Sequence, residues 1–361
     1  MTYLVLLIGL AALVAGAEVL VRGASAVAVR TGLSPIVVGL TVVAFGTSTP
    51  ELAVSVGAAR GDQAGLAIGN VVGSNILNVL VVLGVSAVIG GGLVVAQKIV
   101  RIDVPLMILA SLGVVLMSAN GSISRWEGVA LFAAIVAYTV WTVVASRKDP
   151  DEIAAEYDEA FGQQPQRSVL IDVASIIGGI VLLVLGSQWM VGAASEIAES
   201  FGVSDLVIGL TVVAVGTSAP ELATSIIAAL RGERDIAVGN VVGSNLFNLL
   251  AVLGITAIVA PGGLPVSDDA LRLDLPIMTA VAVACLPVFF NGFELKRWEG
   301  ALFVLYYVAY ITFLVLDQTG SGLRDPFAVA MVGFVLPLTA LTLVVVTVRT
   351  VRQFRLDRAL R

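Results

Sequence analysis

The chain repeats part of itself. Residues 32–85 align with residues 202–255 without a gap, and 32 of the 54 aligned pairs are identical. Each copy contains a Gly-Thr-Ser-x-Pro-Glu motif, which ends at Glu51 in the first copy and at Glu221 in the second. Both motifs lie in stretches that are otherwise apolar enough to sit in lipid, where a buried acid is costly and by default functional. The duplication therefore predicts one cation site built from both halves.

Composition places the chain in a membrane. Of its 361 residues, 58% are hydrophobic and 13% are charged, whereas soluble domains carry about 25% charged residues. The chain has no histidine, which removes the usual proton relay and the usual transition-metal ligand. Its single cysteine, Cys285, excludes an intramolecular disulfide and a thiolate metal cluster. The first residues lack a basic segment, so we expect a first span that is retained rather than a cleaved signal peptide.

Hydropathy predicts eleven apolar runs of roughly the 20 residues that cross a bilayer. They lie near 3–20, 33–58, 66–90, 103–119, 127–146, 169–190, 203–229, 236–260, 275–290, 298–317 and 327–348. The repeat extends over five spans in each half, and an odd number forces the halves to lie oppositely in the membrane. We therefore expect an all-α membrane protein with two inverted five-helix repeats, that is ten core transmembrane helices, and one extra C-terminal helix.

The same reading divides the chain into four parts. We expect a first repeat over 1–146, an acidic cytoplasmic linker over 147–168, a second repeat over 169–317, and an additional span with a basic tail over 318–361. If the N-terminus faces outside, sixteen of the 20 Lys and Arg residues fall on the cytoplasmic side and four outside. The positive-inside rule therefore predicts an outer N-terminus and an inner C-terminus.

Each motif also contains a proline in mid-helix. Proline cannot donate to the carbonyl four residues back, so Pro50 and Pro220 free the carbonyls of Gly46 and Gly216. Such irregular backbone at membrane depth survives only if it is buried in protein or lines a cavity. Carboxylates and released carbonyls are ligands for a hard cation such as Ca²⁺, which takes about six to eight oxygens. The alternative is a kinked helix whose glutamate pairs with a basic residue, but no Lys or Arg lies at mid-membrane depth in the predicted spans.

Hydroxyl and amide groups surround each glutamate in the sequence. Thr47 and Ser48 lie four and three residues before Glu51 and share its helix face, and Thr217 and Ser218 repeat this before Glu221. The next predicted helix of each half carries a Gly-Asn-x-x-Gly-Ser-Asn-x-x-Asn motif, in which residues 70, 74 and 78 form one polar stripe. We assign a site role to the last asparagine of each copy, Asn78 and Asn248. For Asn75 and Asn245, packing between helices and ligation both stay open.

These paired motifs resemble the cation/calcium exchanger superfamily, and specifically prokaryotic sodium/calcium exchangers. The resemblance covers about residues 1–317 and implies that Glu51 and Glu221 coordinate calcium jointly, helped by the carbonyls of Thr47 and Thr217. It implies sodium sites that use these groups together with the positions Ala44, Ser48, Ser74, Ala214, Ser218 and Ser244. The central polar pair of the family corresponds to Asn78 and Asn248. Two departures are Asn248, where relatives often have aspartate, and the eleventh span; the first argues against a potassium-dependent transporter.

The resemblance implies a secondary antiporter that exchanges Ca²⁺ for Na⁺ by alternating access, with the first and sixth spans as a sliding gate. Proton/calcium exchange by the same glutamates is the alternative within transport. A glutamate-lined cation channel and an intramembrane metalloprotease are alternatives from other classes, the latter disfavoured by the absence of histidine. We expect no enzymatic activity, no cofactor besides the transported ions, no nucleic-acid partner and no obligatory protein partner. The expected location is the cytoplasmic (inner) membrane of a prokaryote.

Overall fold

The computed structural model describes residues 1–61, 64–146, 168–201, 214–345 and 348, and these residues are almost entirely helical. The linker 147–167, the first part of the predicted span 203–229 and the basic tail 349–361 lie outside the described residues. The elements of the first half are α1 (Thr2–Thr31), α2 (Pro35–Val38), η1 (Gly39–Val43), α3 (Ala44–Thr47), α4 (Thr49–Arg60), α5 (Ala64–Leu77), η2 (Asn78–Leu83), α6 (Gly84–Ile89), β1 (Leu93–Val94), η3 (Ile99–Asp103), α7 (Val104–Ser118), β2 (Ser122–Ile123) and α8 (Arg125–Ser146).

The second half repeats this order within the described residues, apart from its last two elements. Its elements are α10 (Val169–Ser200), α12 (Ala214–Thr217), α13 (Ala219–Leu230), α14 (Arg234–Leu246), η5 (Phe247–Val252), α15 (Leu253–Val259), β3 (Leu264–Pro265), η6 (Ala270–Asp274), α16 (Leu275–Phe290), β4 (Glu294–Leu295), α17 (Arg297–Gln318), α18 (Arg324–Ala330) and η7 (Met331–Val335). The elements written η are π-helical, and most of them continue an α-helix without a break.

Nine helices in the described part of the chain are long and apolar enough to cross a membrane, or ten if the bent pair Pro35–Thr47 and Thr49–Arg60 is one span. All ten lie at predicted spans. Of the predicted span 203–229, α12 and the short apolar helix α13 are described. Two helices exceed their predicted lengths, because α1 continues to Thr31 and α10 to Ser200. Hydropathy marks only the apolar part of such a helix; α1 ends where Gly32 takes a left-handed conformation (φ 63°).

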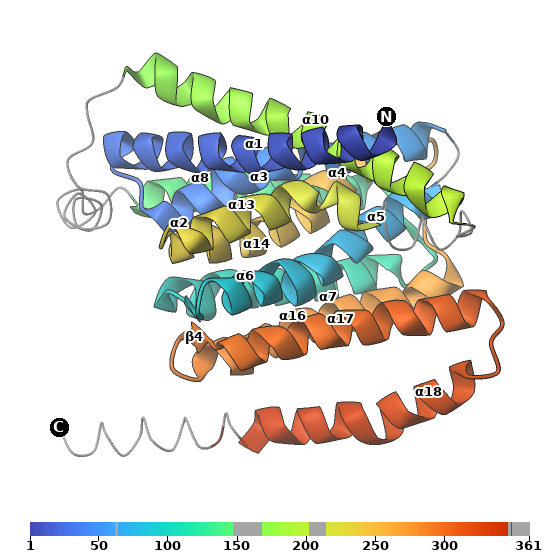
Figure 1. Cartoon of the computed structure of the whole chain (residues 1–361). Coiled ribbons are helices and arrows are strands. Elements are labelled where there is room, and N and C mark those ends of the chain that lie inside the picture. The colour runs from blue at the N-terminus through green and yellow to red at the C-terminus, as the bar shows by residue number, and fades with distance from the viewer. Residues whose placement is uncertain (62–63, 147–167, 202–213, 346–347, 349–361) are drawn as a thin grey trace, which may run out of the picture.

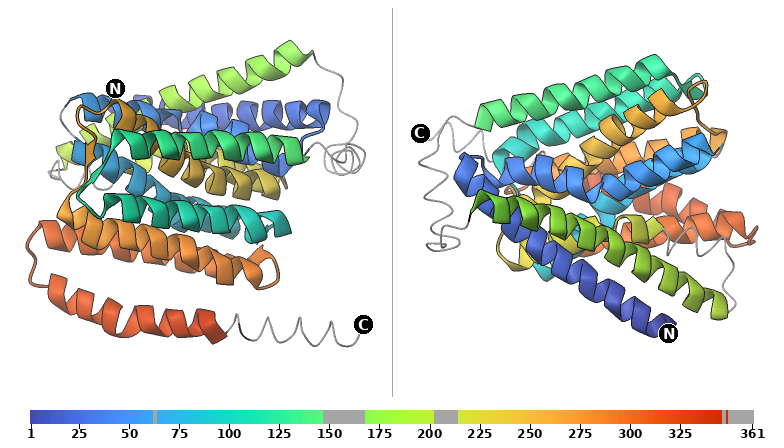
Figure 2. Two further views of the ribbon diagram at one scale, coloured as in Figure 1. Left: turned by 180° about the vertical axis from the view of Figure 1, so that it is seen from behind. Right: turned by 90° about the horizontal axis from the view of Figure 1, so that it is seen from above.

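The helices form a bundle with a buried centre (Figure 1). The span formed by α14, η5 and α15 is the most buried, with 89% of its apolar window inside the protein, and the span of α5, η2 and α6 follows with 72%. The last span, Arg324–Val345, has no buried part in its window and lies at the edge beside α17 (Figures 1 and 2). The two spans that carry the asparagine motifs are therefore the core of the molecule.

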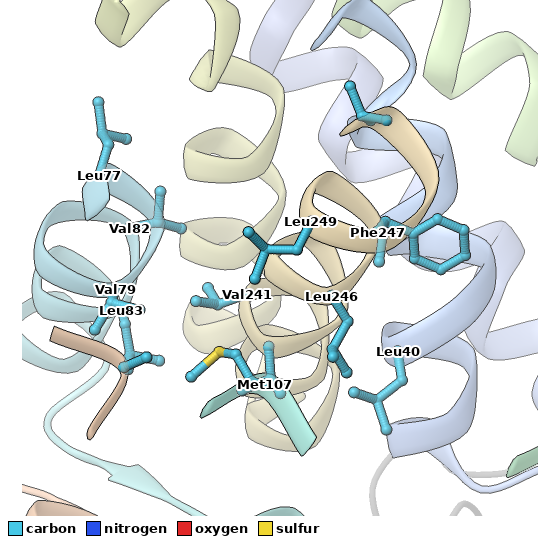
Figure 3. Packing of buried hydrophobic residues seen from close by; sticks show 14 of the residues in the cluster. Leu40, Leu77, Val79, Val82, Leu83, Met107, Val241, Leu246, Phe247 and Leu249 are labelled. Atoms are coloured by element: carbon cyan, nitrogen blue, oxygen red, sulfur yellow. The ribbon is translucent and has the colours of Figure 1, made fainter. Parts of the chain in front are cut away.

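Apolar side chains from both halves pack around this core. Figure 3 shows Leu40 of η1, Leu77 of α5 and Met107 of α7 around Leu246 and Leu249 of the central span. Close approach is possible because the central helix presents glycine: a Cβ on Gly243 would lie 2.8 Å from Cβ of Ala44. The helix α3, which leads into the first motif, therefore packs directly against α14.

The helices α1 and α10 lie side by side along one flank of the bundle (Figures 1 and 2). Glycines spaced by seven residues bring their backbones together: a Cβ on Gly16 would lie 2.9 Å from the carbonyl oxygen of Gly179, and one on Gly9 would lie 2.8 Å from that of Gly186. Arg30 also donates to Asp172 at 2.7 Å near one end of the pair. These two helices therefore form one closely packed unit.

Loops from the two halves pair with each other. The strand β1 is antiparallel to β4, and β2 is antiparallel to β3. Arg125 and Arg297, which occupy equivalent positions, donate to the carbonyl oxygens of Ala260 at 3.3 Å and of Val88 at 3.0 Å. The loops and helix ends of each half therefore contact those of the other half in equivalent ways.

Candidate functional site

The two Gly-Thr-Ser-x-Pro-Glu motifs form helix breaks. α3 ends at Thr47 and α4 begins at Thr49, with an angle of 43° between the two helical parts. Ser48 (φ −83°, ψ 6°) and Ser218 (φ −91°, ψ 10°) occupy the breaks in non-helical conformations. The prolines that follow can begin a helix but cannot continue the previous one, which explains the position of the breaks.

Glu51 and Glu221 lie in the first turns of α4 and α13, and both are fully buried. The serine of each motif bonds to the glutamate of the other: Oγ of Ser48 donates to Oε1 of Glu221 at 3.3 Å, and Oγ of Ser218 donates to Oε1 of Glu51 at 3.4 Å. The structure thus brings the predicted glutamates and serines of both halves into one cluster, with each carboxylate at a helix N-terminus that favours negative charge.

The second oxygen of each carboxylate makes no hydrogen bond within the described residues. Oε2 of Glu51 and Oε2 of Glu221 have no hydrogen-bond partner among the described residues. Neither carboxylate forms an ion pair with a Lys or Arg in this part of the chain. The kinked-helix alternative, in which the glutamate pairs with a basic residue, therefore finds no support among the described residues.

Further predicted hydroxyls lie beside these carboxylates. Oγ1 of Thr47, almost fully buried, lies 3.3 Å from Oγ of Ser244, and Ser74 of α5 is buried as well. Thr217 is half-buried at the end of α12. Ala44 is buried at the start of α3, and Ala214 begins α12. Of the predicted hydroxyl residues, Thr47 and Ser244 therefore meet between α3 and α14.

The asparagines occupy the centre of the two core spans. Nδ2 of Asn78 donates to Oδ1 of Asn245 at 3.1 Å, whereas both polar atoms of the fully buried Asn248 lack a partner among the described residues. The π-helical segment η2 begins at Asn78, and η5 begins at Phe247, one residue before Asn248; such local widening is frequent at functional sites. Asn75 and Asn245 donate to each other's carbonyl oxygens at 3.4 Å, so they bond the two spans together.

Sequence reasoning missed three serines. Ser55 and Ser225 are fully buried and accept hydrogen bonds from Asn70 at 3.0 Å and Asn240 at 2.9 Å. Their signal was present, since each lies four residues after a motif glutamate in both copies. Ser187 of α10 donates to the Gly216 carbonyl at 2.5 Å, and only the fold could show that these residues meet.

The cluster can hold a hard cation. It offers carboxylate, hydroxyl, amide and carbonyl oxygens, which suit Na⁺ and Ca²⁺ rather than transition metals. Among the described residues no group of three or more His, Cys, Asp or Glu side chains could hold a metal ion. The formal charge of the cluster is therefore that of two glutamates, enough to balance one divalent ion or two monovalent ions.

Both the sequence and the fold are similar to those of known proteins. The family model described as sodium/calcium exchanger protein matches residues 1–144 and 171–316. The inner membrane protein YrbG of Escherichia coli (strain K12) is 36% identical over 284 residues, which are 77% of this chain and 85% of that protein. The sodium/calcium exchanger MaX1 of Methanosarcina acetivorans is 32% identical over 345 residues, covering 86% and 98%. A solved structure of the sodium-calcium exchanger NCX_Mj matches with a TM-score of 0.74 at 29% identity, covering 86% of this chain and 97% of that one.

Proposed function

This chain belongs to the sodium/calcium exchanger protein family, and on that premise we propose that it is a secondary antiporter that exchanges Ca²⁺ for Na⁺. It is an integral membrane protein with the helical fold of a cation exchanger. One observation carries the finer proposal: two fully buried glutamates from different halves each accept a hydrogen bond from the serine of the opposite motif. Two buried charges without a basic partner in the described residues need a cation for compensation.

In this proposal Glu51 and Glu221 bind one Ca²⁺ jointly, with the carbonyls of Thr47 and Thr217 as further ligands. Sodium ions bind to the same carboxylates together with Ser48, Ser218, Ser74, Ser244 and the positions Ala44 and Ala214. Because both ions need the same oxygens, they exclude each other, and this exclusion couples their movements. Asn78 and Asn248 contribute neutral polar atoms at the centre, and the partnerless amide of Asn248 supports this role.

Sodium is favoured over the proton as counter-ion by the surroundings of the carboxylates. A proton needs only the carboxylate oxygen, whereas Na⁺ needs several neutral oxygens around it. Ser48 and Ser218 supply hydroxyls at the glutamates. Proton/calcium exchange stays the alternative, and the experiment below separates the two.

Alternating access requires a part that moves over the site. We assign this part to α1 and α10, whose close glycine packing supports movement as one unit. Ser187 of α10 contacts the Gly216 carbonyl at the second break. A shift of α10 would therefore move or break this contact at the second motif.

The two halves are proposed to lie oppositely in the membrane, with the N-terminus outside and the C-terminus inside. The loop pairing supports this: β1 and β4 belong to loops predicted inside, and β2 and β3 to loops predicted outside. Equivalent loops of the two halves, those with β1 and β3, thereby fall on opposite faces. The division at 1–146, 147–168, 169–317 and 318–361 follows from the same arrangement. The inner membrane is the proposed location, in line with the name of the relative YrbG.

Uptake of radioactive calcium into proteoliposomes tests the proposal. We expect uptake when the vesicles are loaded with sodium and diluted into sodium-free buffer, and none with equal sodium on both sides. Uptake driven by an imposed proton gradient, with equal sodium on both sides, would identify the proton rather than sodium as the counter-ion. Uptake along the calcium gradient alone, without any counter-ion, would identify a channel and overturn the exchange mechanism.

A further inference from the structure

Asn240 of α14 is fully buried and contacts both motifs. Its Nδ2 donates to the main-chain carbonyl oxygen of Glu221 at 3.4 Å and to Oγ of Ser225 at 2.9 Å. Its Oδ1 accepts a hydrogen bond from Oγ1 of Thr47 at 3.2 Å. One side chain thus bonds the turn that carries Glu221 to the threonine of the other half.

Asn70 makes the corresponding bonds in the first half. Its Nδ2 donates to the carbonyl oxygen of Glu51 at 3.2 Å and to Oγ of Ser55 at 3.0 Å. The sequence separations are 19 and 15 residues in both halves. Both copies therefore contain the same contact between the asparagine and the glutamate turn.

These bonds matter because the glutamate turns follow a break. The chain is not helical at Ser48 and Ser218, so the preceding helices α3 and α12 do not fix the direction of α4 and α13. A bond to the glutamate's own carbonyl from a neighbouring span supplies that restraint. The side chain of Glu221 leaves the same turn, so its carboxylate moves whenever the turn moves.

Direct ligation by Asn240 is the alternative, and the contacts argue against it. Both ends of its amide are bonded to protein groups. In contrast, both polar atoms of Asn248 lack a partner among the described residues. Asn240 therefore acts through its neighbours rather than on the ion.

Resting on the exchange function proposed above, we propose that Asn240 and Asn70 are positioning residues that hold the Glu221 and Glu51 turns in place for cation binding, and that Asn240 couples the Glu221 turn to Thr47 across the two halves. Outer groups that orient metal ligands typically change affinity by about 10- to 100-fold when removed. A change of that size is expected in ion affinity rather than in the amount of folded protein.

The test is Asn240→Leu, a substitution of similar volume without polar atoms. Initial rates of sodium-driven calcium uptake are measured over a range of calcium concentrations and normalised to folded transporter. We expect KM for calcium to rise by roughly tenfold or more while the maximal rate changes far less. Ser225→Ala, which leaves the bonds to Glu221 and Thr47, should raise KM by a smaller factor.

Thr256→Val is the matched control. Thr256 lies in α15 of the same span, is fully buried, and its Oγ1 has no hydrogen-bond partner among the described residues. Its removal deletes a buried hydroxyl without touching either motif. KM and maximal rate should both equal those of the wild type.

Coupling across the halves is tested by a double-mutant cycle with Thr47→Val. If Asn240 acts on Thr47, the two substitutions together raise KM by less than the product of their separate factors. If the double variant raises KM by the full product of the two separate factors, the coupling to Thr47 is overturned. A lower maximal rate with unchanged KM would reduce Asn240 to a structural residue and overturn the positioning role.

Two further measurements keep the outcome decisive. If Asn240→Leu does not fold, Asn240→Ser, which removes the amide but keeps a small polar side chain, must show the same rise in KM. Stabilisation of the purified protein by calcium in thermal unfolding should need a correspondingly higher calcium concentration in the variant. If the wild type binds calcium but exchanges it without regard to sodium, the exchange proposal fails, and this binding shift still decides the role of Asn240.

Discussion

At the scale of single residues, burial decides what the motif glutamates can do. Glu51 and Glu221 are fully buried, and each has one oxygen bonded to a serine and one without a partner among the described residues. Charge in such a place is stable only when it is compensated. In the proposed exchanger a transported cation would provide this compensation reversibly, which a permanent ion pair with Lys or Arg would not.

We expect Glu51→Gln and Glu221→Gln each to abolish calcium exchange while the protein still folds. The amide is isosteric and can keep the serine contact, but it leaves a bound Ca²⁺ with one carboxylate, so that one positive charge is uncompensated at a buried site. Sodium-driven calcium uptake and thermal unfolding in detergent check the two parts. Asp268→Asn, at a side chain that is 85% exposed, is the control that should transport normally. Robust exchange by either glutamine variant would remove that residue from the site.

Ser187 shows how a single hydroxyl distinguishes the halves. It donates to the carbonyl of Gly216, whereas the equivalent position of the first half is Ala17. Ser187→Ala should leave a buried carbonyl without this partner and destabilise the protein by about 1–3 kcal/mol. The expected readout is a lower melting temperature. Ser175→Ala on the same helix is the control, since Ser175 only bonds its own helix at Ile171; equal melting temperatures for both variants would contradict the role of Ser187.

At the scale of elements, small residues determine which helices can pack closely. α1 and α10 approach so closely that a Cβ on Gly179 would lie 2.7 Å from the main-chain nitrogen of Leu20. Ion pairs also connect these helices to their surroundings: Glu18 of α1 pairs with Arg231 at the end of α13, at an Nε–Oε2 distance of 2.7 Å. Glu18 therefore contacts a basic residue away from the cation cluster.

Neighbouring glycines of α10 offer a matched pair of substitutions. Gly179→Ala places a methyl group against the backbone of α1, whereas a Cβ on Gly178 would meet nothing within 4 Å. Overpacking of this kind typically costs about 1–3 kcal/mol. The melting temperature should fall for Gly179→Ala and stay unchanged or rise for Gly178→Ala. If both variants unfold at the wild-type temperature, the contact between α1 and α10 is looser than the structure indicates.

At the scale of the whole molecule, the orientation in the membrane decides which face each ion reaches first. Cysteine labelling tests it, because Cys285 is the single cysteine of the chain and is buried. In a Cys285→Ser background, Asp268→Cys should react with an impermeant maleimide added outside intact cells. Gln97→Cys, also exposed, should react only after the membrane is opened. The reverse pattern would invert the proposed topology.

Much of this protein followed from sequence alone. The predicted membrane spans, the irregular backbone near Pro50 and Pro220 and the burial of both glutamates depend on local properties: apolar length, the missing N–H of proline, and the repetition of one motif. Such properties act over a few residues and need no knowledge of neighbours in space. The sequence did not predict the π-helical segments that contain Asn78 and Asn248.

Only the tertiary structure decided which residues of one half meet which residues of the other. Ser48 bonds to Glu221 rather than to Glu51 in its own motif, and Asn240 reaches Thr47 across 193 positions of sequence. Ser187 finds the carbonyl freed by Pro220 from a different helix. Hydrogen bonds of this kind depend on the distance and angle at which packed helices present their side chains. The motifs alone determine which groups are available for a cation, and the packing of the two halves determines where those groups converge.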